Sequence, residues 1–182
     1  MVFPQRRDGA AMSVTIRPAR PDEALAVARA HVRADFETYQ PIFREQTVRR
    51  DLGAMRLRWS EALAAGDDLL VAEAEGKVVG FAHVRGDWLS ALYLIGRYRR
   101  RGIGRRLIAE LRARARARGI ERLRLNVVAA NAPAIAFYEA HGGRAIGREI
   151  IHEGDRAWED LVFELPTLLP RRMLKTRDYG SS

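Results

Sequence analysis

The stretch from Leu89 to Arg118 constrains the fold more than any other part of the chain. An apolar run leads into a basic loop that contains glycines, and a helical pattern follows. The apolar residues of that pattern are Ile103, Leu107, Leu111 and Ala115. Gly119 then stands where helices commonly end in a left-handed residue. The pattern predicts a strand, a tight turn and a helix that begins at or near Gly102.

The start of this helix is suited to an anion. The first turn of a helix has backbone N–H groups without helical acceptors and carries a partial positive charge, so phosphate oxygens bind there. Gly102 and Gly104 have no side chain to keep a ligand away from the backbone. Well-placed arginines add charge-assisted hydrogen bonds of about 1.5 to 3 kcal/mol each. We therefore expect this stretch to bind a diphosphate.

Spacing excludes the two common nucleotide-binding loops. A Walker A loop needs Lys and Ser or Thr after its last glycine, where this chain has Arg105 and Arg106. The dinucleotide fingerprint needs a small residue where Leu107 stands. The remaining pattern, R-x-x-G-x-G over residues 99–104, resembles the acetyl-CoA loop of the GNAT superfamily of N-acetyltransferases. Taken alone, the loop also fits a solvated basic turn.

A second motif supports the resemblance. In the segment from Asn131 to Gly143, the positions that resemble the second GNAT signature are Asn131, Ala134, Phe137, Tyr138 and Gly142. This motif follows the first by one helix and one strand, as in the family. The resemblance extends from about Ile16 to Leu165. It implies a mixed α/β fold, with a central, mostly antiparallel sheet, a parallel β-α-β crossover and flanking helices.

The resemblance also implies acetyl-CoA as cosubstrate and assigns roles to residues. The backbone of Leu92, Tyr93 and Leu94 would pair with the pantetheine arm. The residues that would cradle the pyrophosphate are Arg99, Arg100, Arg101, Gly102, Ile103, Gly104 and Arg105. Asn131 would hydrogen-bond the cofactor arm, and Tyr138 would face the thioester sulfur as general acid. From the helical pattern alone, Tyr138 reads as a core aromatic residue.

Two positions depart from the family pattern. Gly96 stands where the family often has proline, which predicts a looser entrance to the loop. Trp88, with Asp87 beside it, stands where many members carry a glutamate as general base. The base therefore stays open among Asp87, Glu153, Asp155 and water alone.

The length of 182 residues suits one domain. We expect a disordered leader over residues 1–13, a single domain over residues 14–165 and a tail over residues 166–182. Expected elements outside the central stretch are a strand at 14–17, a helix from Pro21, a loop or short helix at 35–47, a helix at 52–66, a hairpin at 75–76, a strand at 123–128, a helix after Asn131 and a hairpin around 152–156.

Composition narrows the classes of function. The net charge of +9 and pI near 10.8 suit an anionic cofactor, an acidic surface or nucleic acid. The arginines are dispersed along the chain without forming one stripe, which argues against an arginine-rich nucleic-acid-binding module. The absence of cysteine excludes disulfides, thiolate zinc sites and an acetyl-cysteine intermediate. Four scattered histidines predict no metal site, and the lack of a membrane-length apolar run or signal segment predicts a cytoplasmic protein.

The predicted activity is acetyl transfer from acetyl-CoA by direct attack of a primary amine. The resemblance places the acceptor pocket at residues 35–50 and 152–158. Its acidic residues are Asp35, Glu37, Glu153 and Asp155, and they favour a cationic small-molecule amine or amino-acid derivative. A ribosomal or N-terminal protein acetyltransferase is the alternative within the class, and a CoA-binding domain without catalysis is a further one. Leu168, Leu169 and Leu174 are candidates to cover a homodimer partner.

Overall fold

A computed structural model describes residues 13–47 and 49–168, and these divide into two compact units. The first unit comprises the described residues up to His83 and the segment Ala91–Leu107. The second comprises Val84–Ser90 and the described residues from Ile108 onward. The expected leader, apart from Ser13, and the expected tail beyond Leu168 lie outside the described residues.

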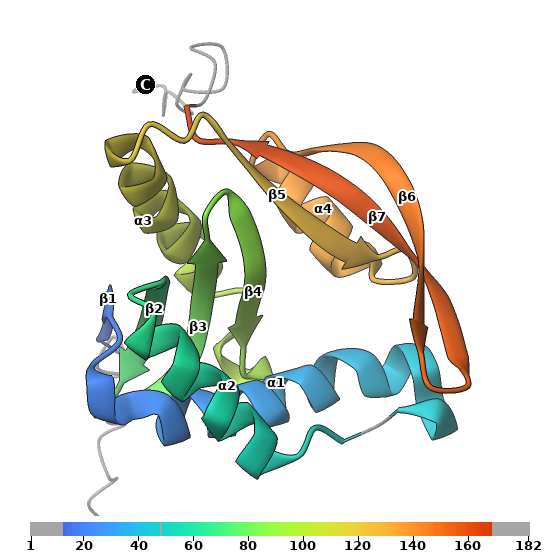
Figure 1. The fold of residues 1–182 in the computed structure, drawn as a ribbon, viewed down its shortest axis with the longest axis horizontal. Helices are drawn as coiled ribbons and strands as arrows, with labels where there is room; N and C mark the ends of the chain where they lie inside the picture. The colour runs from blue at the N-terminus through green and yellow to red at the C-terminus, as the bar shows by residue number, and fades with distance from the viewer. Residues whose placement is uncertain (1–12, 48, 169–182) are drawn as a thin grey trace, which may run out of the picture. The chain divides into compact units, whose positions relative to one another are not determined.

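The strands form a mixed sheet with the order β1-β2-β3-β4-β5-β7-β6 (Figure 1). Their bounds are β1 Val14–Pro18, β2 Asp68–Ala74, β3 Lys77–Arg85, β4 Trp88–Leu94, β5 Arg122–Val128, β6 Arg144–Glu153 and β7 Arg156–Pro166. β1 pairs antiparallel with β2, and β7 pairs antiparallel with both β5 and β6. β4 and β5 are parallel, with Trp88 opposite Arg124. The predicted mixed sheet with a β-α-β crossover is confirmed.

Four α-helices and three short 3-10 helices are present within the described residues. The α-helices are α1 Ala24–Phe43, α2 Leu52–Ala64, α3 Ile103–Ala117 and α4 Ala132–Ala140. The 3-10 helices are η1 Pro21–Glu23, η2 Arg44–Gln46 and η3 Gly96–Tyr98. None of the helices in this described part is long and apolar enough to cross a membrane.

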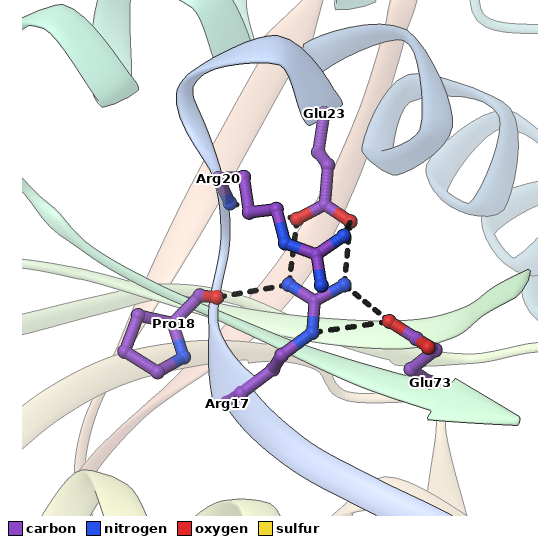
Figure 2. Close-up of polar contacts among 5 residues, drawn as sticks. All are labelled: Arg17, Pro18, Arg20, Glu23 and Glu73. Atoms are coloured by element: carbon purple, nitrogen blue, oxygen red, sulfur yellow. Dashed lines mark hydrogen bonds and ion pairs between the residues drawn. The ribbon is translucent and has the colours of Figure 1, made fainter. Parts of the chain in front are cut away.

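An arginine at the end of β1 joins three elements of the first unit (Figure 2). Arg17 donates to both carboxylate oxygens of Glu23, at 2.6 and 2.7 Å, and its Nε donates to Oε2 of Glu73 on β2 at 3.0 Å. The same Glu23 carboxylate accepts the backbone N–H of Arg20 at 2.7 Å. These bonds hold the pKa of Glu23 below its ordinary value despite partial burial. The cluster fixes the turn from which α1 begins.

α1 is longer than the sequence predicts. The stretch from residue 35 to residue 47, expected to be a loop or short helix, instead continues α1 to Phe43 and is followed by η2. Pro41 lies in the last turn, where a proline removes only one helical hydrogen bond near the helix end. Side chains from Asp35 to Thr38 form hydrogen bonds with β4 and with the loop after it. Because these contacts hold the stretch in place, the helix persists beyond the point expected from its proline.

Aromatic rings form the centre of the first unit. His31 of α1 lies 5.4 Å from Trp59 of α2, 5.3 Å from Phe81 of β3 and 4.8 Å from Tyr93 of β4, measured between ring centroids. Trp59 and Phe81 are fully buried. The rings therefore connect two helices with two strands, and they hold Tyr93 at the end of β4 that leads into the basic loop.

The second unit contains β5, β7, β6, α4 and most of α3. Its buried apolar residues include Leu123, Leu125, Phe163 and Leu165. The buried guanidinium of Arg112 on α3 donates to the carbonyl oxygens of Pro166, at 2.9 Å, and His141. α3 ends at Ala117, and Gly119, with φ of 76°, is the left-handed residue predicted to follow it. The N–H groups of Gly119 and Ile120 donate to the carbonyls of Arg116 and Ala115 and so close the helix end.

The start of the expected tail is continuous with β7. Pro166 is the last residue of that strand, and the Thr167 N–H donates to the Glu121 carbonyl at 2.9 Å. Leu168, one of the leucines expected at a dimer interface, is 72% exposed, whereas Leu169 and Leu174 lie outside the described residues. The domain boundaries and the homodimer stay predictions.

Candidate functional site

The end of β4 is held closely against β3. A Cβ atom on Gly80 of β3 would lie 2.6 Å from the carbonyl oxygen of Tyr93, so only glycine permits this approach. The Ile95 N–H donates to the carbonyl of Val79 at 3.0 Å. The Tyr93 hydroxyl donates to Oδ1 of Asp35 at 3.2 Å, and burial raises the pKa of Tyr93 well above its ordinary value. The segment from Leu92 to Leu94 is therefore rigidly placed.

Glu37 of α1 binds the entrance to the loop. The Gly96 N–H donates to Oε2 of Glu37 at 2.5 Å, and Nε of Arg33 donates to Oε1 at 2.8 Å. Burial acts to raise the pKa of Glu37, but the hydrogen bonds from Arg33 and Gly96 hold it below its ordinary value. The expectation of a looser entrance at Gly96 is wrong, because the N–H that proline lacks is bound by a carboxylate.

The side chain of Arg99 forms its hydrogen bonds with other groups of the protein. Its Nε donates to the Leu94 carbonyl at 2.9 Å, and its Nη2 donates to Thr38 Oγ1 at 2.8 Å and to the Ala34 carbonyl at 3.2 Å. Its backbone N–H donates to the Gly96 carbonyl at 3.0 Å. The Arg99 side chain therefore fixes the loop on α1, and its contact with a phosphate stays a prediction.

The residues after Arg99 form the concave start of α3. Arg100 and Gly102 both have left-handed backbone, with φ of 59° and 75°. For a non-glycine residue such as Arg100 this conformation costs about 1 to 2 kcal/mol, and such strain is concentrated at functional sites. Left-handed residues in tight loops also orient successive N–H groups toward a common anion.

The first helical hydrogen bond of α3 runs from the Arg106 N–H to the Gly102 carbonyl, at 3.2 Å. The four N–H groups of residues 102–105 consequently have no acceptor inside the helix. The side chains of Arg100, Arg101 and Arg105 are exposed around this helix start. Ile103 is 2% exposed and belongs to the core. The helix start thus combines unpaired donors, a positive helix end and arginines, which is an arrangement suited to a pyrophosphate.

Asn131, in the second unit, caps α4. Its Oδ1 accepts the Ala134 N–H at 3.2 Å, and the residue is 8% exposed. The cap uses only the amide oxygen, so the amide nitrogen is the atom able to donate to a ligand. The sequence predicted a cofactor contact here and missed the capping role of the same side chain.

Tyr138 is also part of the second unit and is 7% exposed. Its ring centroid lies 5.2 Å from that of Phe137 and 6.2 Å from that of Phe163 on β7. A Cβ on Gly143 would lie 2.9 Å from the Tyr138 carbonyl oxygen, so the chain turns closely under the end of α4. The ring is consequently fixed by packing, which matches the core interpretation and leaves its catalytic role a prediction.

Acidic residues expected at the acceptor pocket are mostly engaged within their own units. Asp35 is 2% exposed, accepts from Tyr93 and lies 3.6 Å from Nε of Arg50. Glu153 pairs with Arg156, and Asp155 lies exposed in the turn between β6 and β7.

The remaining candidate base, Asp87, lies just before β4, whereas the basic loop follows the other end of that strand. Its side chain is 60% exposed and lies 4.0 Å from Nε of Arg124. No single base therefore emerges from the geometry.

A cavity of about 730 Å³ lies in the second unit, at the end of α3 and the adjoining ends of β5 and β7. Its lining includes Arg116, Arg122, Arg144 and Glu164. Glu164 is bound by Arg122 at 2.8 Å and by Arg144 at 3.6 Å. None of the predicted site residues lines it. Across residues 13–47 and 49–168 there is also no group of three His, Asp or Glu residues able to hold a metal ion.

Glu37 and Thr38 are the residues of the loop region whose role the sequence did not reveal. Both bind groups that lie about sixty positions further along the chain, Gly96 and Arg99. Local periodicity carries no information about such pairs, so no sequence signal was available apart from the unusual Gly96 itself.

The chain matches known proteins over most of this region. The model of the acetyltransferase (GNAT) family matches residues 28–143, which include the basic loop, Asn131 and Tyr138. The chain is also 34% identical over 108 residues to the peptidyl-lysine N-acetyltransferase YiaC of Escherichia coli (strain K12). That match covers 59% of this chain and 64% of YiaC, slightly less than two thirds of the relative's length.

Solved structures agree on the fold. A GCN5-related N-acetyltransferase from Rhodopseudomonas palustris superposes with a TM-score of 0.70 at 23% identity, covering 87% of this chain and 99% of the other. A ribosomal-protein-alanine N-acetyltransferase from Brucella melitensis superposes with a TM-score of 0.66 at 29% identity, covering 82% and 97%. The first of these likenesses shows the fold alone.

Proposed function

Since the chain belongs to the GNAT family of acetyltransferases, whose cosubstrate is acetyl-CoA, we propose that it transfers the acetyl group of acetyl-CoA to a primary amine. The observation that carries the proposal is the start of α3. There, the N–H groups of residues 102–105 lack helical acceptors, Arg100 adopts a strained left-handed conformation, and exposed arginines surround the turn.

In this proposal some loop residues bind the pyrophosphate, and others position the loop. The N–H groups of residues 102–105 and the side chains of Arg100, Arg101 and Arg105 bind the pyrophosphate. Arg99 and Glu37 are positioning residues, because they hold the loop on α1 through hydrogen bonds within the protein. The backbone of Leu92 to Leu94 pairs with the pantetheine arm, and the amide nitrogen of Asn131 donates to the same arm.

The chemistry proceeds by direct attack, since the chain has no cysteine to form an acetyl-thioester intermediate. A lysine-like amine, with a pKa of about 10.4, costs roughly 4 kcal/mol to deprotonate near pH 7.5. A water-relayed carboxylate accepts that proton, and general-base help of this kind is worth about 10² to 10⁴ in rate. Tyr138 donates a hydrogen bond to the sulfur as negative charge develops there. The larger gain comes from holding amine and thioester at reacting distance.

The acceptor that we propose is a cationic small molecule or amino-acid derivative. The second candidate is a lysine side chain or N-terminus of a protein, which is favoured by the 34% identity to YiaC and the 29% identity to the Brucella enzyme. All of these acceptors present the same reacting group, an alkylammonium that must lose a proton.

The test is release of free CoA thiol from acetyl-CoA in the presence of a panel of amines. The panel contains short alkylamines, free amino acids, lysine peptides and alanine N-terminal peptides. We expect turnover with at least one primary amine and a kcat lowered about 10- to 100-fold in Tyr138→Phe, with little change in the KM for acetyl-CoA. An unchanged kcat in that variant removes Tyr138 from catalysis. No turnover with the whole panel contradicts the proposed activity.

A further inference from the structure

The two outermost strands of the sheet differ in how well they resist pairing with another chain. β1 has five residues and ends in Pro18. β6, at the other end of the strand order, has ten residues without proline, and its residues from Arg144 to Ile150 are all exposed (Figure 1). Short strands and proline discourage pairing, whereas a long open edge offers a row of main-chain donors and acceptors. Among the described strands, β6 is therefore the edge suited to a partner.

The hydrogen bonds of β7 show which main-chain groups of β6 point outward. The carbonyl of Glu159 on β7 accepts the N–H of the first residue after β5 at 2.9 Å, so Glu159 directs its main chain toward β5. Successive residues of a strand direct their N–H and C=O groups to alternate sides. Asp160 therefore faces β6, and its register partner Glu149 faces β7. The N–H and C=O groups of Arg148 and Ile150 consequently point to the open edge.

Two large apolar side chains lie exposed on this strand. Ile146 is 49% exposed and Ile150 is 59% exposed, and they are two of five such residues within the part of the chain that the structure describes. Ile150 is the register partner of Glu159, which stands four positions before Phe163 and so shares its face of the sheet. Ile146 stands four positions before Ile150 and projects to that face too. The open edge thus carries an apolar pair beside its free main-chain groups.

Charges on an edge strand normally repel an approaching strand. Most charges of β6 are instead neutralised within the hairpin that β6 forms with β7. The ion pairs are Arg148 with Glu159 at 2.9 Å, Arg144 with Glu164 at 3.6 Å, and Glu153 with Arg156. Like charges that meet across two strands are destabilising. Because Arg148 has its counter-ion on the same hairpin, it can lie opposite a second Arg148 without that penalty in full.

A second copy of β6 matches this edge in one antiparallel register. Two identical strands related by a two-fold axis pair antiparallel with one residue opposite its own copy. With Arg148 on the axis, its outward N–H and C=O groups pair with those of its copy. Ile146 then lies opposite Ile150 of the second copy, and this pair occurs twice. On the other face of the sheet, Glu149 lies opposite Gly147, so no two acids meet.

We propose that β6 pairs with β6 of a second copy of this chain, which gives a symmetric homodimer. The pairing joins the edge strands through main-chain hydrogen bonds and removes the apolar surface of Ile146 and Ile150 from water. A strand from another protein would find the same main-chain groups but would not in general place isoleucines opposite both of these. The proposal concerns assembly and does not depend on the proposed acetyl transfer.

Sedimentation equilibrium of the full chain over a range of concentrations tests for the dimer. We expect a mass that approaches twice the 20.6 kDa of one chain as the concentration rises. Ile150→Lys places a charge on the edge, and it should raise the dissociation constant about 100-fold because each dimer carries the change twice. The matched control is Leu57→Lys on α2, where the side chain is 61% exposed. A monomer at every concentration, or equal effects of the two substitutions, overturns the proposal.

Amide hydrogen exchange, measured by NMR at each residue, identifies the surface that the dimer uses. The outward N–H groups of Arg148 and Ile150 should be protected at concentrations where the dimer forms, and they should exchange rapidly after dilution. The N–H groups of Glu149 and Ile151, which face β7, should be protected in both states and serve as internal controls. A dimer that leaves Arg148 and Ile150 unprotected uses another surface and overturns the proposal.

The absence of cysteine from the chain allows the register to be tested by cross-linking. Ile146→Cys and Ile150→Cys are oxidised separately and as an equimolar mixture. Residues opposite each other on antiparallel strands have Cβ atoms about 4.5 to 5.5 Å apart, close to disulfide distance. Copies of the same residue would be separated by four positions, or roughly 13 Å along the strand. We expect disulfide-linked dimers in the mixture and few in either sample alone. No cross-link in the mixture, or equal cross-linking in the separate samples, overturns the proposed pairing.

Discussion

Oε2 of Glu37 lies 2.5 Å from the backbone nitrogen of Gly96, and this contact joins the middle of α1 to the entrance of the basic loop. A proline at position 96, common in the family, could not make it, because proline has no N–H. The glutamate and the glycine therefore act as a pair. Together with the Arg99 bonds to Thr38 and to the Ala34 carbonyl, the pair fixes the loop from its base.

Gly96→Pro should destabilise the protein by about 1 to 3 kcal/mol, because it leaves the Glu37 carboxylate without its backbone donor. The added Cβ would also lie 3.0 Å from Oε2 of Glu37. In a Glu37→Ala background the same change should cost much less. Urea unfolding of the two single variants and the double variant measures the coupling, and strictly additive costs would contradict the pairing.

Substitutions at Arg99 and Arg101 should affect different properties, the first mainly the stability of the fold and the second mainly the affinity for acetyl-CoA. Arg99→Lys loses most of three hydrogen bonds within the protein and should cost about 1 to 3 kcal/mol of unfolding free energy. Arg101→Ala removes an exposed side chain, so stability should change by less than about 0.5 kcal/mol. Its acetyl-CoA affinity should nevertheless fall about 10-fold or more. Urea unfolding and calorimetric titration of acetyl-CoA are measured on both variants. Lost affinity with unchanged stability in Arg99→Lys, and lost stability with unchanged affinity in Arg101→Ala, would make Arg99 the ligand and Arg101 the support.

Much of the fold was predictable because its signals are local. The stripe from Ile103 to Ala115 and the stop at Gly119 gave α3 with accurate ends, and the order of strand, helix and strand gave the parallel crossover. The extent of α1 was not predictable. Pro41 is a local signal for a break, whereas the contacts that keep the helix intact come from β4 and the loop, which lie far along the chain.

In the candidate site, too, some features follow from local sequence signals and others depend on contacts between distant parts of the chain. Glycines and arginines at fixed spacing located the anion-binding turn, but spacing could not show that Arg99 is directed toward α1 while Arg100 and Arg101 are exposed.

Asn131 is expected to have two roles that two substitutions can separate. Asn131→Asp keeps an oxygen to cap α4 but removes the amide donor, so stability should hold while acetyl-CoA binds more weakly. Asn131→Ala removes both groups and should also lose about 0.5 to 2 kcal/mol of stability. Urea unfolding and calorimetry on both variants provide the comparison. Wild-type affinity in Asn131→Asp would confine this residue to capping.

His31 should make the stability depend on pH. Burial, with the charges of Arg58 and Arg50, lowers its pKa in the folded protein to about 3. Protonation therefore favours the unfolded chain, where the pKa is about 6.5. The stabilising effect is complete above that value and is lost as the pH falls toward 3, amounting to about 2 kcal/mol at pH 5.

Unfolding in urea at pH 7 and pH 5 measures this loss. The variant His31→Phe should show a smaller difference between the two pH values than the wild type. A change at the exposed His152, His152→Gln, is the control and should leave the difference unaltered. If His31→Phe retains the full wild-type pH dependence, another group is responsible.

The most direct test of the central claim is calorimetric titration of acetyl-CoA into the wild type, Gly102→Glu and Gly119→Glu. Gly102 and Gly119 lie at opposite ends of α3, with φ of 75° and 76° and open space where a Cβ would stand. The two substitutions thus impose the same backbone strain and the same charge. We predict that the wild type and Gly119→Glu bind acetyl-CoA and that Gly102→Glu loses at least about 100-fold in affinity. Equal binding by both variants, or no binding by the folded wild type, would contradict the assignment of the loop to acetyl-CoA.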